Sequence, residues 1–398
     1  MKIVFTFLLV ILLVFSGYHL SFRNFRIPLF ARKFYLTGLE FLFLGLLLGP
    51  NFLNILDKET CEGLAPLSAL VLGWIGMLFG FQFELAKLKR FPLYFFPAAV
   101  LESGVTLVIV FAGVYLALPF IIAVPDDIRT VISLALAGAA ACTAQTALSL
   151  LALRSSAGHQ PMVKFLRYLS SIDGLIAMLV LLPVFVYFPR SRLMSGQTMS
   201  IGADTMTAVI SGFGLILLFN LFLARRREQS ELAMITIGMT VFISGFAMIM
   251  NFSPLIANFF IGACMVNVTG EKEKIFNTLV SIEKPVYLLL LVFLGSAWHF
   301  DGLWIIPAAA GYCGIRFLGK FVGGAAVSHL CAGIKTYPSN LGLGLIEQGG
   351  LALAIVYDFH QAFRSELTGI VVGIALLAIV CNDLLSPSML ERALKKDI

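Results

Sequence analysis

The chain has 398 residues, of which 59% are hydrophobic, only 13% are charged and 36 are phenylalanine. So few charged groups could not solvate the surface of a water-soluble globular protein of this size. The composition therefore excludes a soluble domain and predicts an all-α polytopic membrane protein. A spanning helix needs about 20 apolar residues, so about thirteen spans would fill most of the chain and leave short loops.

The formal net charge of +6 would suit a nucleic-acid or acidic partner, but the basic residues lie in short loops between apolar runs. Assigning these loops alternately to the two sides of a membrane puts twenty of the 28 Lys and Arg residues on one side and six on the other, with Arg316 and Lys320 inside a span. Cytoplasmic loops retain positive charge. The pattern therefore predicts thirteen helices in a cytoplasmic (inner) membrane, with the N-terminus outside, the C-terminus inside and no nucleic-acid partner.

In chain order, the first span begins at Met1-Lys2 and ends near residue 20, and a cleaved signal peptide is the competing interpretation. The other spans are expected near residues 34–56, 63–84, 93–118, 129–153, 165–188, 201–223, 231–250, 252–269, 281–299, 303–332, 336–357 and 366–387. Residues 388–398 would form a short cytoplasmic tail.

Spans four and eleven share five residues at a constant offset of 210, namely Pro97, Ala98, Ala99, Gly104 and Gly113 with Pro307, Ala308, Ala309, Gly314 and Gly323. Seven helices separate the partners, and an odd separation reverses the orientation. We therefore predict two inverted six-helix repeats, 1–188 and 231–387, joined by a linker helix at 201–223. Transporters built on this plan hold their substrate site near the bilayer midplane.

Spans five and twelve contain small and polar residues at corresponding places. These are Thr143, Gln145 and Thr146 in span five, and Gly342, Gly344, Glu347, Gln348, Gly349 and Gly350 in span twelve. Such residues suit a pair of interrupted helices whose unwound backbone coordinates an ion. They equally suit close helix packing, and for span twelve both interpretations stay open.

Ionisable groups in hydrocarbon each cost about 3 kcal/mol on insertion scales, and they persist where they pair, face a cavity or take part in transport. The candidates are Glu40, Glu102, Asp173, Arg316, Lys320 and Glu347. Asp173, several residues into span six, is the best of them, because burial favours its neutral form and lets a proton and a small hard cation compete for one carboxylate. The alternative is a protonated aspartate that caps a neighbouring helix through a hydrogen bond.

Arg316 and Lys320 lie one turn apart on a single helical face. A fixed cation there could hold Asp173 or Glu102 in its anionic state, or either side chain could snorkel or form a structural ion pair. Glu40 and Glu102 would also serve as packing or subunit-contact acids. The sequence shows no metal-ligand spacing, activated nucleophile or phosphate loop, so we expect no enzyme activity, metal or cofactor.

Six further segments occur in a characteristic order, namely Gly38-Leu39-Glu40 to Gly49-Pro50, Gly76 to Gly80 with Glu84, the Asp173 segment, residues 256–262, residues 316–320 and Gln348-Gly349-Gly350. Together, over residues 34–387, they resemble the transmembrane domain of the monovalent cation:proton antiporter superfamily, especially its potassium-efflux and bacterial sodium/proton exchanger branch. The resemblance implies core and dimerisation domains, crossed interrupted helices five and twelve, elevator-like alternation of access and a homodimer.

For the site, the resemblance implies Asp173 as the ion and proton carboxylate and Thr143 as its neighbour in the unwound part of helix five. It implies Arg316 or Lys320 as the core-domain cation. Gln145, Thr146, Glu347 and Gln348 would be supporting polar residues of the interrupted helices.

Three departures from the family pattern are Ile172 where the family has Asn or Asp, Ala144 after Thr143, and Leu351 after Gln348-Gly349-Gly350. In the family, an Asp at the position of Ile172 is associated with an extra charge per cycle, so Ile172 favours electroneutral exchange.

The sequence predicts an electroneutral Na⁺/H⁺ or K⁺/H⁺ antiporter in the lipid bilayer. An organic-anion transporter that binds its substrate through Arg316 and Lys320, and a non-transporting membrane partner or sensor, are the alternatives. No nucleotide-binding domain follows the last span, so regulation of that kind would need a separate subunit.

Overall fold

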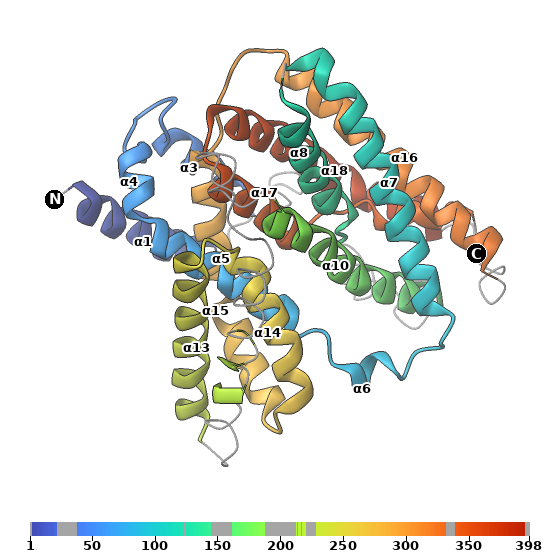
Figure 1. Ribbon diagram of the computed structural model, residues 1–398, viewed down its shortest axis with the longest axis horizontal. Helices are drawn as coiled ribbons and strands as arrows, with labels where there is room; N and C mark the ends of the chain where they lie inside the picture. The colour runs from blue at the N-terminus through green and yellow to red at the C-terminus, as the bar shows by residue number, and fades with distance from the viewer. Residues whose placement is uncertain are drawn as a thin grey trace. The chain divides into compact units, whose positions relative to one another are not determined.

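The computed structural model describes residues 2–21, 38–122, 124–144, 161–187, 212, 214–215, 217–219, 228–331 and 339–394. Every regular element in these ranges is a helix (Figure 1). The α-helices are α1 (Lys2–Ser21), α3 (Leu39–Leu48), α4 (Lys58–Gly63), α5 (Ala65–Gly80), α6 (Leu85–Leu88), α7 (Phe95–Ile121), α8 (Asp126–Ala141), α10 (Pro161–Tyr187), α13 (Gln229–Ile249), α14 (Pro254–Val268), α15 (Lys272–Ser296), α16 (Ile305–Leu330), α17 (Gly350–Phe363) and α18 (Glu366–Leu394), and η3 (Leu341–Leu345) is a 3₁₀ helix.

Among the described residues, six helices are long and apolar enough to cross a membrane, judged by length and composition. They contain Phe95–Ile121, Met162–Phe185, Ser230–Ile249, Lys272–Ser296, Ile305–Leu330 and Glu366–Leu390. Three shorter apolar helices are Lys2–Gly17, Ala65–Gly80 and Pro254–Val268. The chain is therefore a multi-pass membrane protein, whereas the thirteen spans and their orientation remain predictions. The expected linker helix at 201–223 lies largely outside the described residues.

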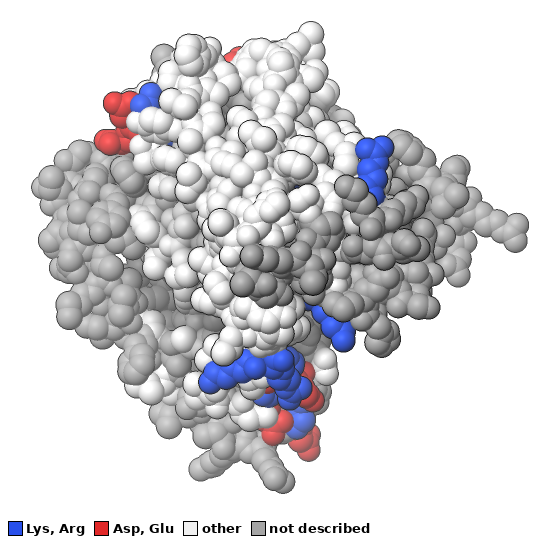
Figure 2. Space-filling view, turned by 90° about the vertical axis from the view of Figure 1, so that its right-hand side faces the viewer, with Lys and Arg blue, Asp and Glu red and all other residues white. Residues whose placement is uncertain are grey.

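The molecular surface agrees with this conclusion. On the face shown in Figure 2, Lys, Arg, Asp and Glu gather in a few small groups, and most of the described surface between them carries other residues. Bands of surface without charge are what a lipid-exposed protein presents to hydrocarbon.

The chain divides into two compact units, each assembled from three stretches of sequence. Unit 1 comprises Met1–Glu84, Arg190–Phe300 and Tyr357–Val372, and unit 2 comprises Leu85–Pro189, Asp301–Val356 and Gly373–Ile398. Each unit takes residues from both halves of the sequence. Compact units and internal repeats are different divisions of a chain, so the repeats at 1–188 and 231–387 remain a prediction.

In unit 1, α3 packs along α15 and α5 packs along α14. Glycines make these contacts possible, because a Cβ atom at Gly45 would collide with the backbone of α15, and a Cβ at Gly76 or Gly80 with the backbone of α14. Close backbone approach through small residues is a common mode of helix association in lipid.

In unit 2, α7 lies beside α16 (Figure 1). The two helices begin at Phe95 and Ile305, which preserves the offset seen in the sequence. Helices α8 and α10 pack against α7. This arrangement positions the candidate site, because Glu102, Asp173 and Lys320 come from α7, α10 and α16 respectively.

The last helix continues beyond its expected end at residue 387. Helix α18 extends to Leu394 and contains Pro387 in its interior. A proline removes one backbone donor and favours a kink, but it does not end this helix. The segment expected as a tail at 388–398 is therefore largely helical within its described part.

Candidate functional site

Helices α7 and α16 bring an acid and an amine together in unit 2. Gly323 and Gly319 of α16 face α7, where an added Cβ would come within 2.8 Å of the Glu102 carbonyl oxygen and 3.2 Å of the Thr106 Cα. Such small residues let the helices approach closely. The approach places Lys320 opposite Glu102.

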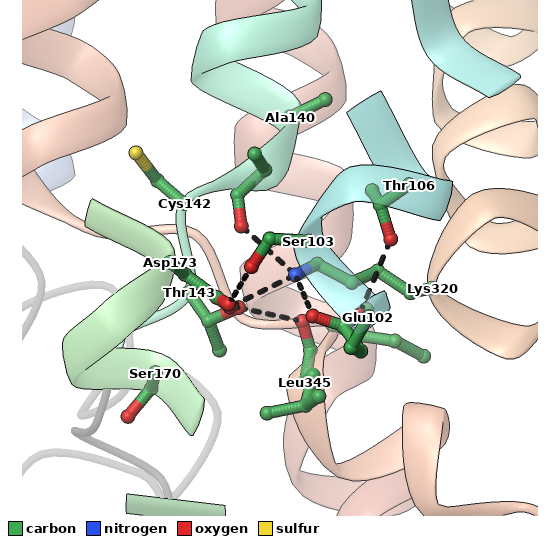
Figure 3. A network of polar contacts seen from close by, with 12 residues as sticks. Glu102, Ser103, Thr106, Ala140, Cys142, Thr143, Ser170, Asp173, Lys320 and Leu345 are labelled. Carbon is green, nitrogen blue, oxygen red and sulfur yellow. Dashed lines mark hydrogen bonds and ion pairs between the residues drawn. The ribbon is translucent and has the colours of Figure 1, made fainter. Parts of the chain in front are cut away.

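The Lys320 ammonium lies at the centre of the network in Figure 3 and has no exposed surface. Its Nζ atom is 3.0 Å from Asp173 Oδ2 and 3.3 Å from Glu102 Oε2, and it donates to the Ala141 carbonyl oxygen at 2.8 Å. An ammonium has three N–H donors, so three acceptors satisfy it. One cation is thus shared by two carboxylates.

Asp173, on α10, is also fully buried. Its Oδ1 accepts a hydrogen bond from the Ser103 hydroxyl, and its Oδ2 accepts one from the Thr143 hydroxyl at 2.6 Å in addition to the Lys320 contact. Three donors therefore surround one carboxylate, which is how a buried ionised group can be tolerated. The predicted proximity of Thr143, Lys320 and Asp173 is present in the structure (Figure 3).

Glu102 is equally buried but accepts fewer hydrogen bonds than Asp173. Its Oε1 accepts from the Thr106 hydroxyl at 3.2 Å and its Oε2 from Lys320 at 3.3 Å. With both acids ionised and Lys320 protonated, the network would contain one excess negative charge. A bare buried charge is costly, so the network favours the uptake of one proton or one external cation.

Two non-helical segments meet beside this network. Helix α8 ends at Ala141, and Cys142 adopts φ −59° and ψ 137°, so residues 142–144 leave the helix. Residues 346–349 are non-helical between η3 and α17. The Ala144 N–H donates to the Glu347 carbonyl oxygen at 2.9 Å, which joins the two breaks. In span twelve the chain is interrupted at residues 346–349, and Gly342 also packs against the backbone of Lys320. Coordination of an ion by the unwound backbone stays a prediction.

Arg316 holds the ends of both interrupted segments. Its guanidinium donates to the carbonyl oxygens of Ala140 at 3.0 Å and Cys142 at 3.1 Å at the end of α8, and to Ile346 at 2.5 Å and Leu345 at 3.5 Å after η3. The last carbonyls of a helix lack intrahelical donors and carry partial negative charge. A buried guanidinium with its fixed fork of donors satisfies four of them at once.

Gln348 belongs to a second polar network that includes α18. Its side-chain amide donates to the Ala139 carbonyl oxygen at 3.0 Å and accepts from Asn382 Nδ2 at 2.8 Å. Its backbone N–H donates to Asp383 Oδ1 at 2.9 Å. A carboxylate just before the N-terminus of α17 complements the helix dipole there, while Arg316 complements the opposite ends on α8 and η3.

The structure distributes the remaining predicted residues as follows. Glu347 contributes its backbone carbonyl to the junction and interacts electrostatically with Asp383. Glu40 lies in the first turn of α3 and belongs to unit 1, whereas the residues of the Asp173 network belong to unit 2. Gln145 and Thr146 lie outside the described residues.

Sequence reasoning missed Ser103, Asn382 and Asp383. Ser103 directly follows Glu102, which was a candidate from the sequence. The charge of Glu102 was therefore the signal that could have pointed to Ser103. Asn382 and Asp383 lie near the end of the last apolar run, a place where a polar residue is usually a solvated helix end. Only the tertiary contacts with Gln348 reveal that they belong to the interior of unit 2.

Comparisons with known proteins agree with this geometry at the level of the fold. No protein-family model and no curated protein sequence matches the chain. The structure matches that of the sodium proton antiporter MjNhaP1 from Methanocaldococcus jannaschii, over 99% of this chain and 100% of the other, with a TM-score of 0.67 and 15% sequence identity. The chain therefore has a cation:proton antiporter fold, and at this identity the likeness concerns the fold alone.

Proposed function

We propose that this protein is a secondary active antiporter that exchanges a monovalent cation, Na⁺ or K⁺, for protons across the membrane, with Asp173 as the cation-binding carboxylate. The observation that carries the proposal is the fully buried ion pair of Asp173 and Lys320 at the break after α8. Buried charges in a membrane protein commonly mark an ion pathway. The antiporter fold supports the same conclusion.

The oxygen atoms around Asp173 suit a hard monovalent cation. The carboxylate, the Thr143 and Ser103 hydroxyls and the carbonyl oxygens of Ala141 and Leu345 lie in one hydrogen-bonded group. Hard cations prefer such oxygen ligands. The two hydroxyls would then turn from the carboxylate and offer their lone pairs to the ion.

Lys320 would act as an internal competitor for the site. Its ammonium lies 3.0 Å from the Asp173 oxygen that also accepts from Thr143, so an incoming cation has to replace it there. Protons enter the same competition because the network contains one more acid than amine. The network therefore holds either one proton or one external cation, and this exclusion couples their movements.

We further propose that exchange is electroneutral and that access alternates by an elevator-type movement. Ile172, next to Asp173, is apolar and buried, and it supplies no additional acid for a second proton. Asp173, Glu102, Thr143, Arg316 and Lys320 all belong to unit 2. A site contained in one compact unit can move as a rigid body, which an elevator requires. The homodimer remains part of the proposal.

The contacts of Arg316 argue against the organic-anion alternative. Four of its five N–H donors are directed at backbone carbonyl oxygens within 3.5 Å. Binding a carboxylate there would leave those carbonyls unsatisfied in the interior, at a cost of about 1–3 kcal/mol for each.

The proposal is tested by reconstituting the purified protein in liposomes that carry a proton gradient and a fluorescent pH dye. Li⁺, Na⁺, K⁺ and Rb⁺ are added in turn, with choline as the control cation. Antiport predicts dequenching by Na⁺ or K⁺ but not by choline, at a rate that an imposed membrane potential leaves unchanged. No response to any cation, from protein that elutes as a single species in detergent, would overturn the antiport proposal and leave the partner or sensor role.

A further inference from the structure

The Asp173 network contains two acids and one amine, and Asp173 accepts more hydrogen bonds than Glu102. Asp173 receives donors from Ser103, Thr143 at 2.6 Å and Lys320 at 3.0 Å. Glu102 receives donors from Thr106 at 3.2 Å and Lys320 at 3.3 Å. Hydrogen bonds to an ionised carboxylate stabilise that form, so the negative charge is more stable on Asp173 than on Glu102.

The charges of the network set how many protons it holds. Glu102, Asp173 and Lys320 are all fully buried. Lys320 balances one acid, and an uncompensated second carboxylate in the interior would be strongly disfavoured. One acid therefore carries a proton when no external cation is bound, and the donor geometry selects Glu102.

We propose that the two exchanged ions use different acids: Asp173 binds the cation, Glu102 carries the proton, and the Lys320 ammonium moves between them without losing its own proton. This inference rests on the proposed antiport. In the proton-loaded state, Glu102 is neutral and Lys320 pairs with Asp173. When a cation binds Asp173, the ammonium pairs with Glu102, whose proton leaves to water.

The two states contain the same total charge. Protonated Glu102, the Lys320 cation and the Asp173 anion sum to zero, and so do the Glu102 anion, the Lys320 cation, the Asp173 anion and the bound monovalent cation. One cation thus replaces one proton. The distances require only a small movement of the ammonium, since both carboxylates already lie within 3.3 Å of Nζ.

Two other titratable groups interact with the described part of this network. On α16, Arg316 lies one turn from Lys320 and interacts electrostatically with Glu102. After α8, the Cys142 thiol interacts with Asp173 and Lys320. Arg316 is directed at backbone carbonyls, so Lys320 is the cation that hydrogen-bonds to the two acids.

The first test is the pH profile of exchange in liposomes for Glu102→Gln. That variant holds no exchangeable proton at position 102, so cation binding would leave one uncompensated positive charge in the network. Lysine side chains in general lose a proton only at alkaline pH. We expect at least a tenfold loss of Na⁺- or K⁺-driven exchange near neutral pH and a shift of the activity midpoint by more than about one unit to alkaline pH. The Glu102→Asp variant should retain the wild-type midpoint. Thr106→Ala removes a donor to Glu102 but no charge, so its midpoint should move much less than that of Glu102→Gln.

The double variant Glu102→Gln with Lys320→Gln removes one charge of each sign. Asp173 alone would then alternate between proton and cation, so exchange near neutral pH should recover relative to Glu102→Gln alone. A purely structural role for Glu102 predicts the opposite, because the double variant would be no more active than the single one. An unshifted midpoint in Glu102→Gln would also overturn the inference.

Infrared difference spectroscopy locates the proton without relying on transport. Addition of Na⁺ or K⁺ to the detergent-purified protein should remove the carbonyl stretch of one protonated carboxyl group. The frequency of that band should change in Glu102→Asp and stay constant in Asp173→Glu, and the reverse pattern would overturn the inference. Wild-type protein that exchanges no cation would refute the antiport proposal itself. If the wild type is active but the pH midpoint of Glu102→Gln is unshifted, only the assignment of the proton to Glu102 is refuted.

Discussion

Lys320 and Asp173 form an ion pair of 3.0 Å between two side chains that have no exposed surface. Breaking a buried pair by removing one partner usually costs about 3–5 kcal/mol, because the other charge is left uncompensated. Here Glu102 lies 3.3 Å from the same ammonium. Loss of Asp173 would therefore leave Lys320 paired, whereas loss of Lys320 would leave two acids without their shared counter-ion.

Substitution Lys320→Gln should make the protein depend on external cations for stability. Two buried carboxylates then face each other, and a bound cation takes over the role of the ammonium. We expect a lower melting temperature in detergent without salt, and a larger stabilisation by Na⁺ or K⁺ than in the wild type. Saturation at about a hundred times the Kd would contribute about 2.7 kcal/mol. Equal stabilisation of both proteins would contradict this account.

Thr143 is expected to act through its hydroxyl. Thr143→Ala removes the 2.6 Å hydrogen bond to Asp173 and a potential cation ligand, while Thr143→Ser retains both. Hydrogen bonds to charged groups contribute about 1.5–3 kcal/mol, so the KM for the cation should rise about tenfold to a hundredfold in Thr143→Ala. Thr143→Ser should remain near the wild type. A similar rise in both variants would indicate a packing role for the methyl group.

Arg316 is expected to stabilise the junction between the two breaks. In Arg316→Gln, several of the four backbone carbonyls would lose their donor, at about 1–3 kcal/mol for each carbonyl left unsatisfied. The stability of Arg316→Lys should lie between those of the wild type and Arg316→Gln, because lysine retains the charge but lacks the forked N–H donors of a guanidinium. Thermal unfolding in detergent measures this order. Wild-type stability in Arg316→Gln combined with loss of organic-anion binding would support the anion transporter instead.

Asp57 caps α4 and pairs with Lys2 of α1 at 2.5 Å. The Lys2 ammonium and the Thr60 backbone N–H, which donates to Asp57 Oδ1 at 3.0 Å, lower the pKa of Asp57 to about 2. A carboxyl whose pKa is depressed on folding stabilises the protein above its unfolded pKa of about 4, and this contribution is lost as pH falls toward the folded value. The side chains are partly exposed, so the effect is small.

The corresponding test uses Asp57→Asn, which retains a capping oxygen but loses the charge. Its melting temperature in detergent should lie slightly below that of the wild type at pH 7, and the difference should shrink below pH 4. Asp57→Ala, which also loses the cap, should remain less stable at both pH values. A wild-type advantage over Asp57→Asn that persists at low pH would exclude the ion pair as its cause.

Much of the site could be predicted from sequence because lipid makes polar residues conspicuous. Asp173, Arg316 and Lys320 stand out within apolar runs, and the two cations have helical spacing. Thr143 and Gln348 were found through polar clusters in spans five and twelve, and the structure places both in buried networks. The helical, multi-pass architecture followed from composition alone.

What the sequence could not distinguish were the separate tasks of two neighbouring cations. Arg316 and Lys320 lie on one face, and spacing says nothing about which reaches a carboxylate. That depends on side-chain length and on where α8 and η3 end, because Arg316 reaches carbonyls at both breaks while Lys320 reaches the acids. Ser103 and Asp383 were missed for a related reason, since their partners, Asp173 and Gln348, lie far from them in the chain.

Cation transport through Asp173 is tested most directly by comparing the wild type with Asp173→Asn and Asp127→Asn in liposomes containing a pH dye. The two variants make the same chemical change, but Asp127 is an exposed residue in the first turn of α8. We predict Na⁺- or K⁺-driven dequenching by the wild type and Asp127→Asn, and none by Asp173→Asn, which should remain folded because Lys320 retains Glu102. Exchange by Asp173→Asn at the wild-type rate would contradict the assignment of Asp173 as the cation-binding carboxylate.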